Sequence, residues 1–127
     1  MAVTLNTRDH SRELYAAWNR AVKETGRDPI ATVTTAAYRA EDAETQVVEV
    51  FGSARSERLE NAFLFATPDD AITYLGTTHF AEEENPPLSP DETASVEAAV
   101  RDHAAEVISA DGVWRVPKPV MVITATR

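Results

Sequence analysis

The pattern of hydrophobic and polar positions predicts that the chain begins with a strand that leads directly into a helix. Residues 2–5 are apolar or β-branched, which favours an extended strand, and the turn-forming pair Asn6-Thr7 follows. Thr7 is a candidate cap for the helix. Apolar residues then recur at helical spacing, which predicts an amphipathic helix that ends near Gly26. The apolar stripe of this helix consists of Leu14, Ala17, Trp18, Ala21 and Val22.

The middle of the chain carries weaker signals. Residues 30–38 fit either extended chain or a short helix, and both assignments stay open. Residues 41–51 are expected to start helical and to end extended, because the second half of this segment is rich in valine. Residues 57–66 alternate as a strand, with Phe63 and Phe65 on one face. The end of this strand is apolar on both faces, so we expect it to be covered.

Two helix starts stand out in the second half of the chain. Thr67-Pro68-Asp69-Asp70 joins a capping residue, a proline and two carboxylates, and predicts a helix that stops at Gly76. Ser89-Pro90-Asp91-Glu92 is a capping box with proline at the first helical position, and predicts a helix that runs to about Ala110. Residues 77–87 lie between these helices, are polar and acidic, and are predicted to form a loop.

The C-terminal part is predicted to be extended, in residues 113–116 and 118–126. Pro117 and Pro119 keep the first of these segments out of a central hydrogen-bonded ladder. The sum is an α/β chain with three or four strands, which we expect to form a single domain over residues 1–127. Its first and last strands are apolar enough to need neighbours on both sides, and exposed apolar edges promote association. We therefore expect a partner chain, either a second copy or a different subunit.

Charge and composition exclude several classes of protein. The chain has 12 basic and 21 acidic residues and a net charge of -9, which disfavours nucleic acids and anionic membranes as partners. The absence of cysteine excludes disulfides, thiolate chemistry and cysteine-ligated zinc. The three histidines are far apart in the sequence, so no metal site is predicted. The chain shows no charged leader and no apolar run of about 18 residues, so a cytoplasmic location is expected.

Candidate chemistry lies at the turn after the first strand. In open α/β sheets, ligands sit just beyond the carboxyl ends of strands, which places Asn6, Arg8, Asp9 and His10 where a site is expected. His10 is a candidate general base, with Asp9 or another carboxylate tuning it. The alternative is that His10 is an exposed residue of the first helical turn.

Aromatic residues suggest a pocket for a small molecule. His79 follows a predicted helix and lies next to Phe80, and the rings of Tyr15, Trp18 and Tyr74 are candidates to line a substrate pocket with them. The alternative for the rings is a place in the core, where aromatics at helical spacing are usually found. The alternative for His79 is a favourable position near a helix C-terminus.

Two stretches together resemble the C-terminal part of class I S-adenosylmethionine-dependent methyltransferases that act on small molecules. Residues 3–14 (VTLNTRDHSREL) are similar to the last parallel strand of that fold and the turn after it. Residues 111–127 (DGVWRVPKPVMVITATR) are similar to its closing antiparallel strand, and the strand through Phe63 resembles the other strand of that closing pair. The resemblance implies a partial Rossmann-like sheet: a strand and helix, then a closing antiparallel strand pair with flanking helices.

The part of the family that holds the cofactor has no counterpart here. In that family an N-terminal half supplies a Gly-rich turn and an acidic residue for the ribose, and this chain has neither. The resemblance therefore implies a substrate-side subunit of a split or heteromeric methyltransferase, inactive without a cofactor-binding partner. S-adenosylmethionine would be bound only through that partner chain, and His10 would be the substrate-side base. Two alternatives stay open: a cofactor-independent cyclase or isomerase, and a non-catalytic binding or scaffold homodimer.

Overall fold

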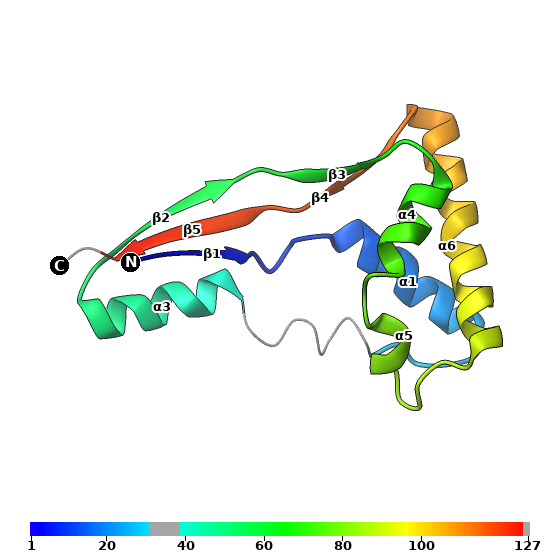
Figure 1. Cartoon of the computed structure of the whole chain (residues 1–127), viewed down its shortest axis with the longest axis horizontal. Helices are drawn as coiled ribbons and strands as arrows, with labels where there is room; N and C mark the ends of the chain where they lie inside the picture. Colours follow the sequence, from blue (N-terminus) through cyan, green and yellow to red (C-terminus); the bar gives the residue numbers. More distant parts are fainter. Residues whose placement is uncertain (31–38, 126–127) are drawn as a thin grey trace.

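A computed structural model describes residues 1–30 and 39–125 of the chain (Figure 1). The segment for which the sequence left two assignments open, residues 30–38, lies outside the described residues except for Ile30. Within the described part, five strands and five helices form an elongated molecule, with one helix at the end that carries both termini and the other four at the opposite end (Figure 1).

A three-stranded antiparallel sheet forms the end that carries the termini. β5 (Val120–Ala125) lies in the middle, between β1 (Ala2–Asn6) and β2 (Ala54–Leu59). Ile123 of β5 lies opposite Val3 on one side and Ser56 on the other. Because β5 is antiparallel to both neighbours, β1 and β2 run in the same direction.

A second antiparallel pair continues the ribbon toward the helical end. β3 (Ala62–Phe65) pairs with β4 (Trp114–Pro117), and Phe65 lies opposite Trp114. The backbone N–H of Lys118 donates to the Asn61 carbonyl at 2.6 Å, which joins this pair to β2 and β5. The single strand predicted over residues 57–66 is therefore interrupted.

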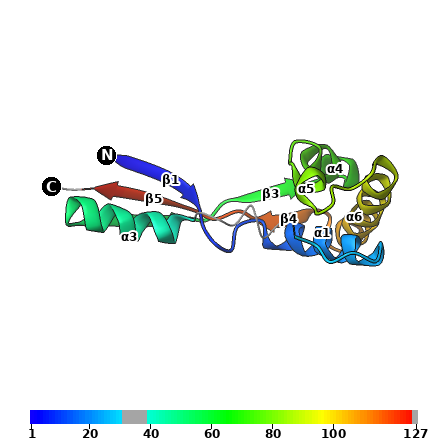
Figure 2. The same ribbon diagram turned by 90° about the horizontal axis from the view of Figure 1, so that it is seen from below.

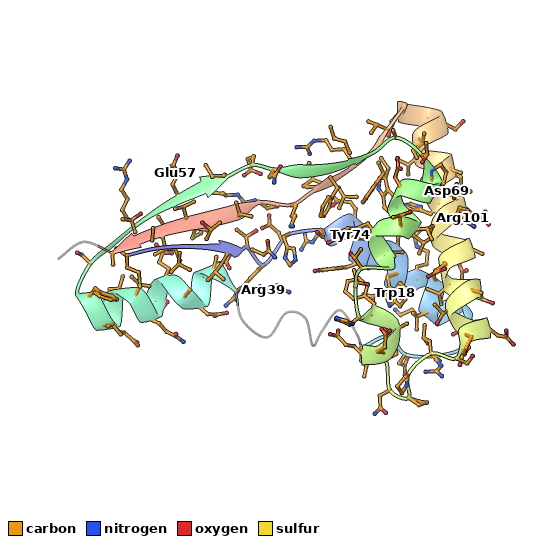
Figure 3. All side chains as sticks on the ribbon, in the orientation of Figure 1. Trp18, Arg39, Glu57, Asp69, Tyr74 and Arg101 are labelled. Carbon is orange, nitrogen blue, oxygen red and sulfur yellow. The ribbon has the colours of Figure 1, made fainter. Side chains whose placement is uncertain are left out.

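Four helices pack around the β3–β4 end of the ribbon. They are α1 (Arg12–Glu24), α4 (Pro68–Leu75), the short α5 (Phe80–Glu83) and α6 (Pro90–Asp111). Their shared core includes side chains that are fully or almost fully buried, namely Leu14, Trp18, Val96, Val100, Trp114 and Val116. Trp18 and Tyr74 both lie in this helical end (Figure 3).

Helix α3 (Ala40–Phe51) packs on one face of the three-stranded sheet (Figure 2). Ala43 and Val47, four residues apart, bury against Ile123 of β5. The expected extended second half of residues 41–51 is wrong: the segment is helical to Phe51 and ends at Gly52, which has a φ of 83°. Burial of one helical face against the sheet overrides the strand propensity of the valines.

The mixed α/β character is confirmed, but the sheet differs from the expected one. Every strand pairing among the described residues is antiparallel, and the five strands form two sheets instead of one sheet of three or four strands. A Rossmann-like methyltransferase sheet is not established by this arrangement. Within the described residues, no helix combines the length and the apolarity needed to cross a bilayer.

Two further local predictions are wrong. The end of the predicted 57–66 strand is not covered on both faces, because Leu64 is 65% exposed. The predicted loop over residues 77–87 contains α5, because Phe80 docks its ring against Trp18 with the ring centroids 5.4 Å apart. The two predicted helix starts are confirmed: Thr67 and Ser89 each accept from the backbone N–H three residues on.

Candidate functional site

The turn between β1 and α1 is held against the junction of β4 and β5. Thr7 is fully buried; its backbone N–H donates to the Pro119 carbonyl at 3.3 Å, and its hydroxyl donates to Asp9 Oδ1 at 2.6 Å. The N–H of Ser11 donates to the Pro117 carbonyl at 2.7 Å, and Ser11 has a left-handed backbone with φ of 53°. Thr7 is therefore not the helix cap. Ser11 takes that position, in a backbone conformation that non-glycine residues adopt rarely and mostly where the surrounding structure requires it.

His10 is buried in this turn, with 5% of its surface exposed. Its Nδ1 lies 2.9 Å from the Thr7 carbonyl, which can only accept, so Nδ1 carries the proton. Its Nε2 lies 2.8 Å from the Tyr15 hydroxyl and accepts from it. The alternative of an exposed first-turn histidine is therefore wrong, and the two hydrogen bonds together select one neutral tautomer.

Burial is the main cause that lowers the pKa of His10 below its ordinary value, and the positive charges of Arg39 and Lys118 lower that pKa further. The hydrogen bond to the Thr7 carbonyl raises this pKa and so opposes the effect of burial in part, and the Asp9 carboxylate opposes it more weakly. The imidazole is thus held neutral by its surroundings, and it presents a lone pair to the Tyr15 phenol.

Asp9 serves as an anchor for the turn. Its carboxylate accepts from Arg58 of β2 at 3.2 and 2.8 Å. These hydrogen bonds and the one from the Thr7 hydroxyl hold the pKa of Asp9 well below its usual range. Asp9 therefore ties the turn to the sheet, and its effect on the pKa of His10 is weak.

A hollow of about 310 Å³ opens beside the His10–Tyr15 pair. It is lined by Arg8, His10, Arg12, Tyr15, Ala16, Asn19 and Arg39. Three of these residues are arginines, and none of the lining residues in the described part of the chain is acidic. The hollow lies where the start of α1 approaches the start of α3, and Figure 3 shows Arg39 at that helix start.

The arginines of the hollow differ in their surroundings. Arg8 pairs with Asp42 at 2.8 Å, but its side chain is still 66% exposed. Arg39 is only 6% exposed, and its Nε has no hydrogen-bond partner among the described residues. An unpaired N–H of a buried guanidinium is costly unless an acceptor is supplied.

The structure brings together only part of the predicted site. Arg8, His10 and Tyr15 line the hollow, while Asp9 faces Arg58. Other predicted residues lie elsewhere, in β1, in the helical core or on the surface, namely Asn6, Trp18, Tyr74, His79 and Phe80.

Most of the predicted aromatic residues lie in the core and do not line the hollow, as the alternative interpretation predicted. Trp18 packs edge-on to Phe80 and donates from its indole N–H to Glu84 at 3.2 Å. Tyr74 packs against Phe63 with the ring centroids 4.5 Å apart. His79 is an exposed residue at the start of α5 and does not line the hollow.

Four lining residues were missed from the sequence, namely Ala16 and three polar or charged ones. Arg12 and Asn19 lie on the same face of α1 as Tyr15, at a helical spacing that the sequence contains. Arg39 had no such signal, because it reaches the hollow only through the packing of α3 on the sheet. Within the described residues, no group of three or more histidine or acidic side chains is arranged to hold a metal ion.

Comparisons with known proteins give no match. No protein-family model matches the chain, and no curated protein and no solved structure is significantly similar to it. The resemblance to methyltransferases therefore stays a prediction from the sequence.

Proposed function

We propose that the chain binds a small anionic molecule in the hollow lined by Arg8, Arg12 and Arg39, next to the His10–Tyr15 pair. One observation carries this proposal: three arginines, of which Arg8 also pairs with Asp42, line a single hollow with no acidic residue among its described lining residues, on a chain with a net charge of -9. A chain of this charge repels anions in general, so anion binding requires a local cluster of positive groups.

The chemistry of arginine narrows the class of ligand. A guanidinium presents a planar fork of N–H donors that matches the oxygen pairs of carboxylates and phosphates. The buried Arg39 has an unpartnered Nε–H, and an anionic oxygen in the hollow would supply the missing acceptor. The ligand class is therefore a small carboxylate or phosphate ester.

The His10–Tyr15 pair gives the hollow an acid–base group. When Tyr15 takes a proton from a bound molecule, its own proton passes to Nε2 of His10 across the 2.8 Å hydrogen bond. The imidazolium that forms is disfavoured by burial, and the negative charge of a bound anion offsets that cost. This arrangement supports the cofactor-independent enzyme or the binding protein among the open alternatives.

Calorimetric titration of inorganic phosphate and of succinate tests the proposal. Binding to the wild-type chain is expected, and Arg39→Gln should weaken it by roughly ten- to a hundredfold, as the loss of about 1.5–3 kcal/mol from a charged hydrogen bond predicts. Arg12→Gln, at an exposed position, gives a second variant that leaves the core intact. Arg101→Gln is the control, because Arg101 lies in α6 and pairs with Asp69 outside the hollow. Absence of binding, or equal affinities in all variants, would refute the proposal.

The methyltransferase subunit is a second candidate function. One feature supports it: β5 is antiparallel to β1, as the family resemblance implies for a closing strand. Within the described residues the turn after β1 offers no cradle for the cofactor, because it has no glycine and its residues Thr7, His10 and Ser11 are buried. S-adenosylmethionine would have to be held by a partner subunit.

Titration of S-adenosylmethionine separates the two functions. The methyltransferase candidate predicts no heat with this chain alone and binding once a cofactor-binding companion is added. The anion-binding proposal predicts that phosphate or succinate binds the chain alone. Binding of S-adenosylmethionine to the isolated chain would contradict the view that the cofactor needs a partner.

A further inference from the structure

The outer edge of β1 is open. Within the described residues β1 pairs only with β5. The Met1 carbonyl accepts from the Ala125 N–H at 3.0 Å, and the Thr7 N–H donates to the Pro119 carbonyl at 3.3 Å. The backbone N–H and C=O groups of the odd-numbered residues of β1 therefore point toward β5. By the alternation of antiparallel ladders, the backbone N–H and C=O groups of Ala2, Thr4 and Asn6 point outward.

The two edge strands of this sheet differ in how well they are protected against pairing with another chain. β2, at the other edge, carries Arg55, Glu57 and Arg58, and charged side chains on an edge strand oppose pairing with another chain. β1 (AVTLN) carries no charge at all. Its edge is therefore the less protected of the two.

An uncharged groove runs beside this open edge. It has a volume of about 320 Å³, lies between β1 and α3, and is lined by no charged side chain among the described residues. Two of its apolar side chains are strongly exposed: Val50 at 74% and Met1 at 62%. The lining is completed by Val3, Leu5, Ala43, Gln46, Val47 and Phe51.

We propose that a second copy of this chain occupies the edge and the groove, with the two β1 strands antiparallel about a two-fold axis at Thr4. The two three-stranded sheets then form one continuous six-stranded sheet. In this register Thr4 faces Thr4 of the second copy as a hydrogen-bonded pair, and Ala2 faces Asn6 of the second copy. A strand whose outward groups alternate in this way complements itself, as a closed two-fold interface requires.

Charge restricts where two copies of this chain can meet. Two chains that each carry -9 repel one another, so they can associate only through an uncharged contact, and the groove provides one. The two-fold axis also brings the exposed Arg8, which follows β1, toward the end of α3 in the second copy. The last turn of α3 has no basic residue, and a cation is favourable at a helix C-terminus.

Sedimentation equilibrium over a range of micromolar concentrations tests this inference. The wild-type chain is expected to form a dimer, and Val50→Lys, which places a charge in the groove without touching the core, should shift the equilibrium to monomer. Leu64→Lys is the matched control, because Leu64 is equally apolar and 65% exposed but lies on β3, away from the groove, and this variant should stay dimeric.

Hydrogen exchange gives an independent readout. The amides of Thr4 and Asn6 should exchange slowly at high protein concentration and rapidly on dilution or in Val50→Lys. The inference is overturned if the wild-type chain is monomeric throughout, if Val50→Lys stays dimeric, or if only a different chain protects these amides. Val50→Lys should keep its affinity for phosphate and succinate, so a failure of this inference is distinguishable from a failure of the anion-binding proposal.

Discussion

The Tyr15 hydroxyl lies 2.8 Å from Nε2 of His10, and it is the donor in that hydrogen bond because the Thr7 carbonyl already holds the proton of Nδ1. The phenol therefore occupies the lone pair of Nε2 and helps to fix the orientation of the imidazole. Both residues line the same hollow, so this hydrogen bond links the stability of the turn to the chemistry of the candidate site.

Replacement of Tyr15 by phenylalanine should destabilise the fold. The change leaves Nε2 of the buried His10 without its hydrogen-bond donor, which costs about 1–3 kcal/mol in the free energy of unfolding. Urea unfolding followed by circular dichroism measures this loss. Tyr74→Phe is the control, because the Tyr74 hydroxyl forms no hydrogen bond with the described residues and only its ring packs against Phe63. Equal losses in the two variants would show that the His10 contact is not the cause.

The stability of the chain should fall when the pH is lowered below the ordinary pKa of histidine. Burial lowers the pKa of His10 and of His103 from the ordinary value of 6.5. Just below pH 6.5 the unfolded chain therefore binds more protons than the folded chain does. The stabilisation that the two neutral histidines provide is fully present above pH 6.5. It is lost progressively as the pH falls through the lowered pKa values of the folded state.

Unfolding free energies measured across this pH range check that prediction. His10→Asn keeps a side-chain N–H that can reach the Thr7 carbonyl but removes the titrating group, so its stability should depend less steeply on pH than that of the wild type. His103→Gln removes the other contribution in the same way. A curve that rises toward low pH, or one that is unchanged in both variants, would contradict the role of burial.

Local chemistry in the sequence located two helix starts and three of the seven residues that line the hollow. The Thr67–Asp70 and Ser89–Glu92 boxes form as predicted, because every hydrogen bond in them joins residues three positions apart. His10 was singled out because it lies in the turn after a predicted strand. These features depend on the neighbouring residues, so periodicity and capping rules were enough to find them.

Other features depend on partners that are distant in the chain. The valines of α3 favour a strand by propensity, and the segment is helical because Val47 packs on Ile123, which lies in the last strand. Arg39 reaches the hollow from the start of the same helix. Neither contact leaves a pattern in the local sequence, so the second half of α3 and the buried arginine were missed.

Truncation of a buried leucine and of an exposed leucine should change the stability of the fold by very different amounts. Leu14 is fully buried at the centre of the helical core, so Leu14→Ala should cost about 2–5 kcal/mol. Leu64 is 65% exposed, so Leu64→Ala should change stability by less than about 0.5 kcal/mol. Chemical denaturation of both variants provides the comparison, and a large loss for Leu64→Ala would indicate that β3 is covered after all.

Two glycines at helix ends should respond oppositely to alanine. Gly52 ends α3 with a φ of 83°, so Gly52→Ala should cost about 1 kcal/mol even though nothing lies within 4 Å of the added Cβ. Gly76 ends α4 in the right-handed region with a φ of -62°, and its added Cβ would meet the Thr73 carbonyl at an ordinary distance of 3.4 Å. Gly76→Ala should therefore be neutral or slightly stabilising in a thermal melt. A neutral Gly52→Ala would argue against the left-handed end of α3.

Glu84→Gln should destabilise the fold although it removes a buried charge. Glu84 is 2% exposed; its Oε1 accepts from the Trp18 indole at 3.2 Å, and its Oε2 accepts from the backbone N–H of Ile30 at 2.9 Å. Glutamine has one oxygen and one amide NH₂, so one of these two donors would face another donor and lose its hydrogen bond. The expected loss is about 1–3 kcal/mol in the free energy of unfolding, measured by urea denaturation. Glu82→Gln, at an exposed position of α5, is the control and should leave stability unchanged. If Glu84→Gln were as stable as the wild type, the carboxylate would not be the acceptor that joins α1 and Ile30 to the segment after α5.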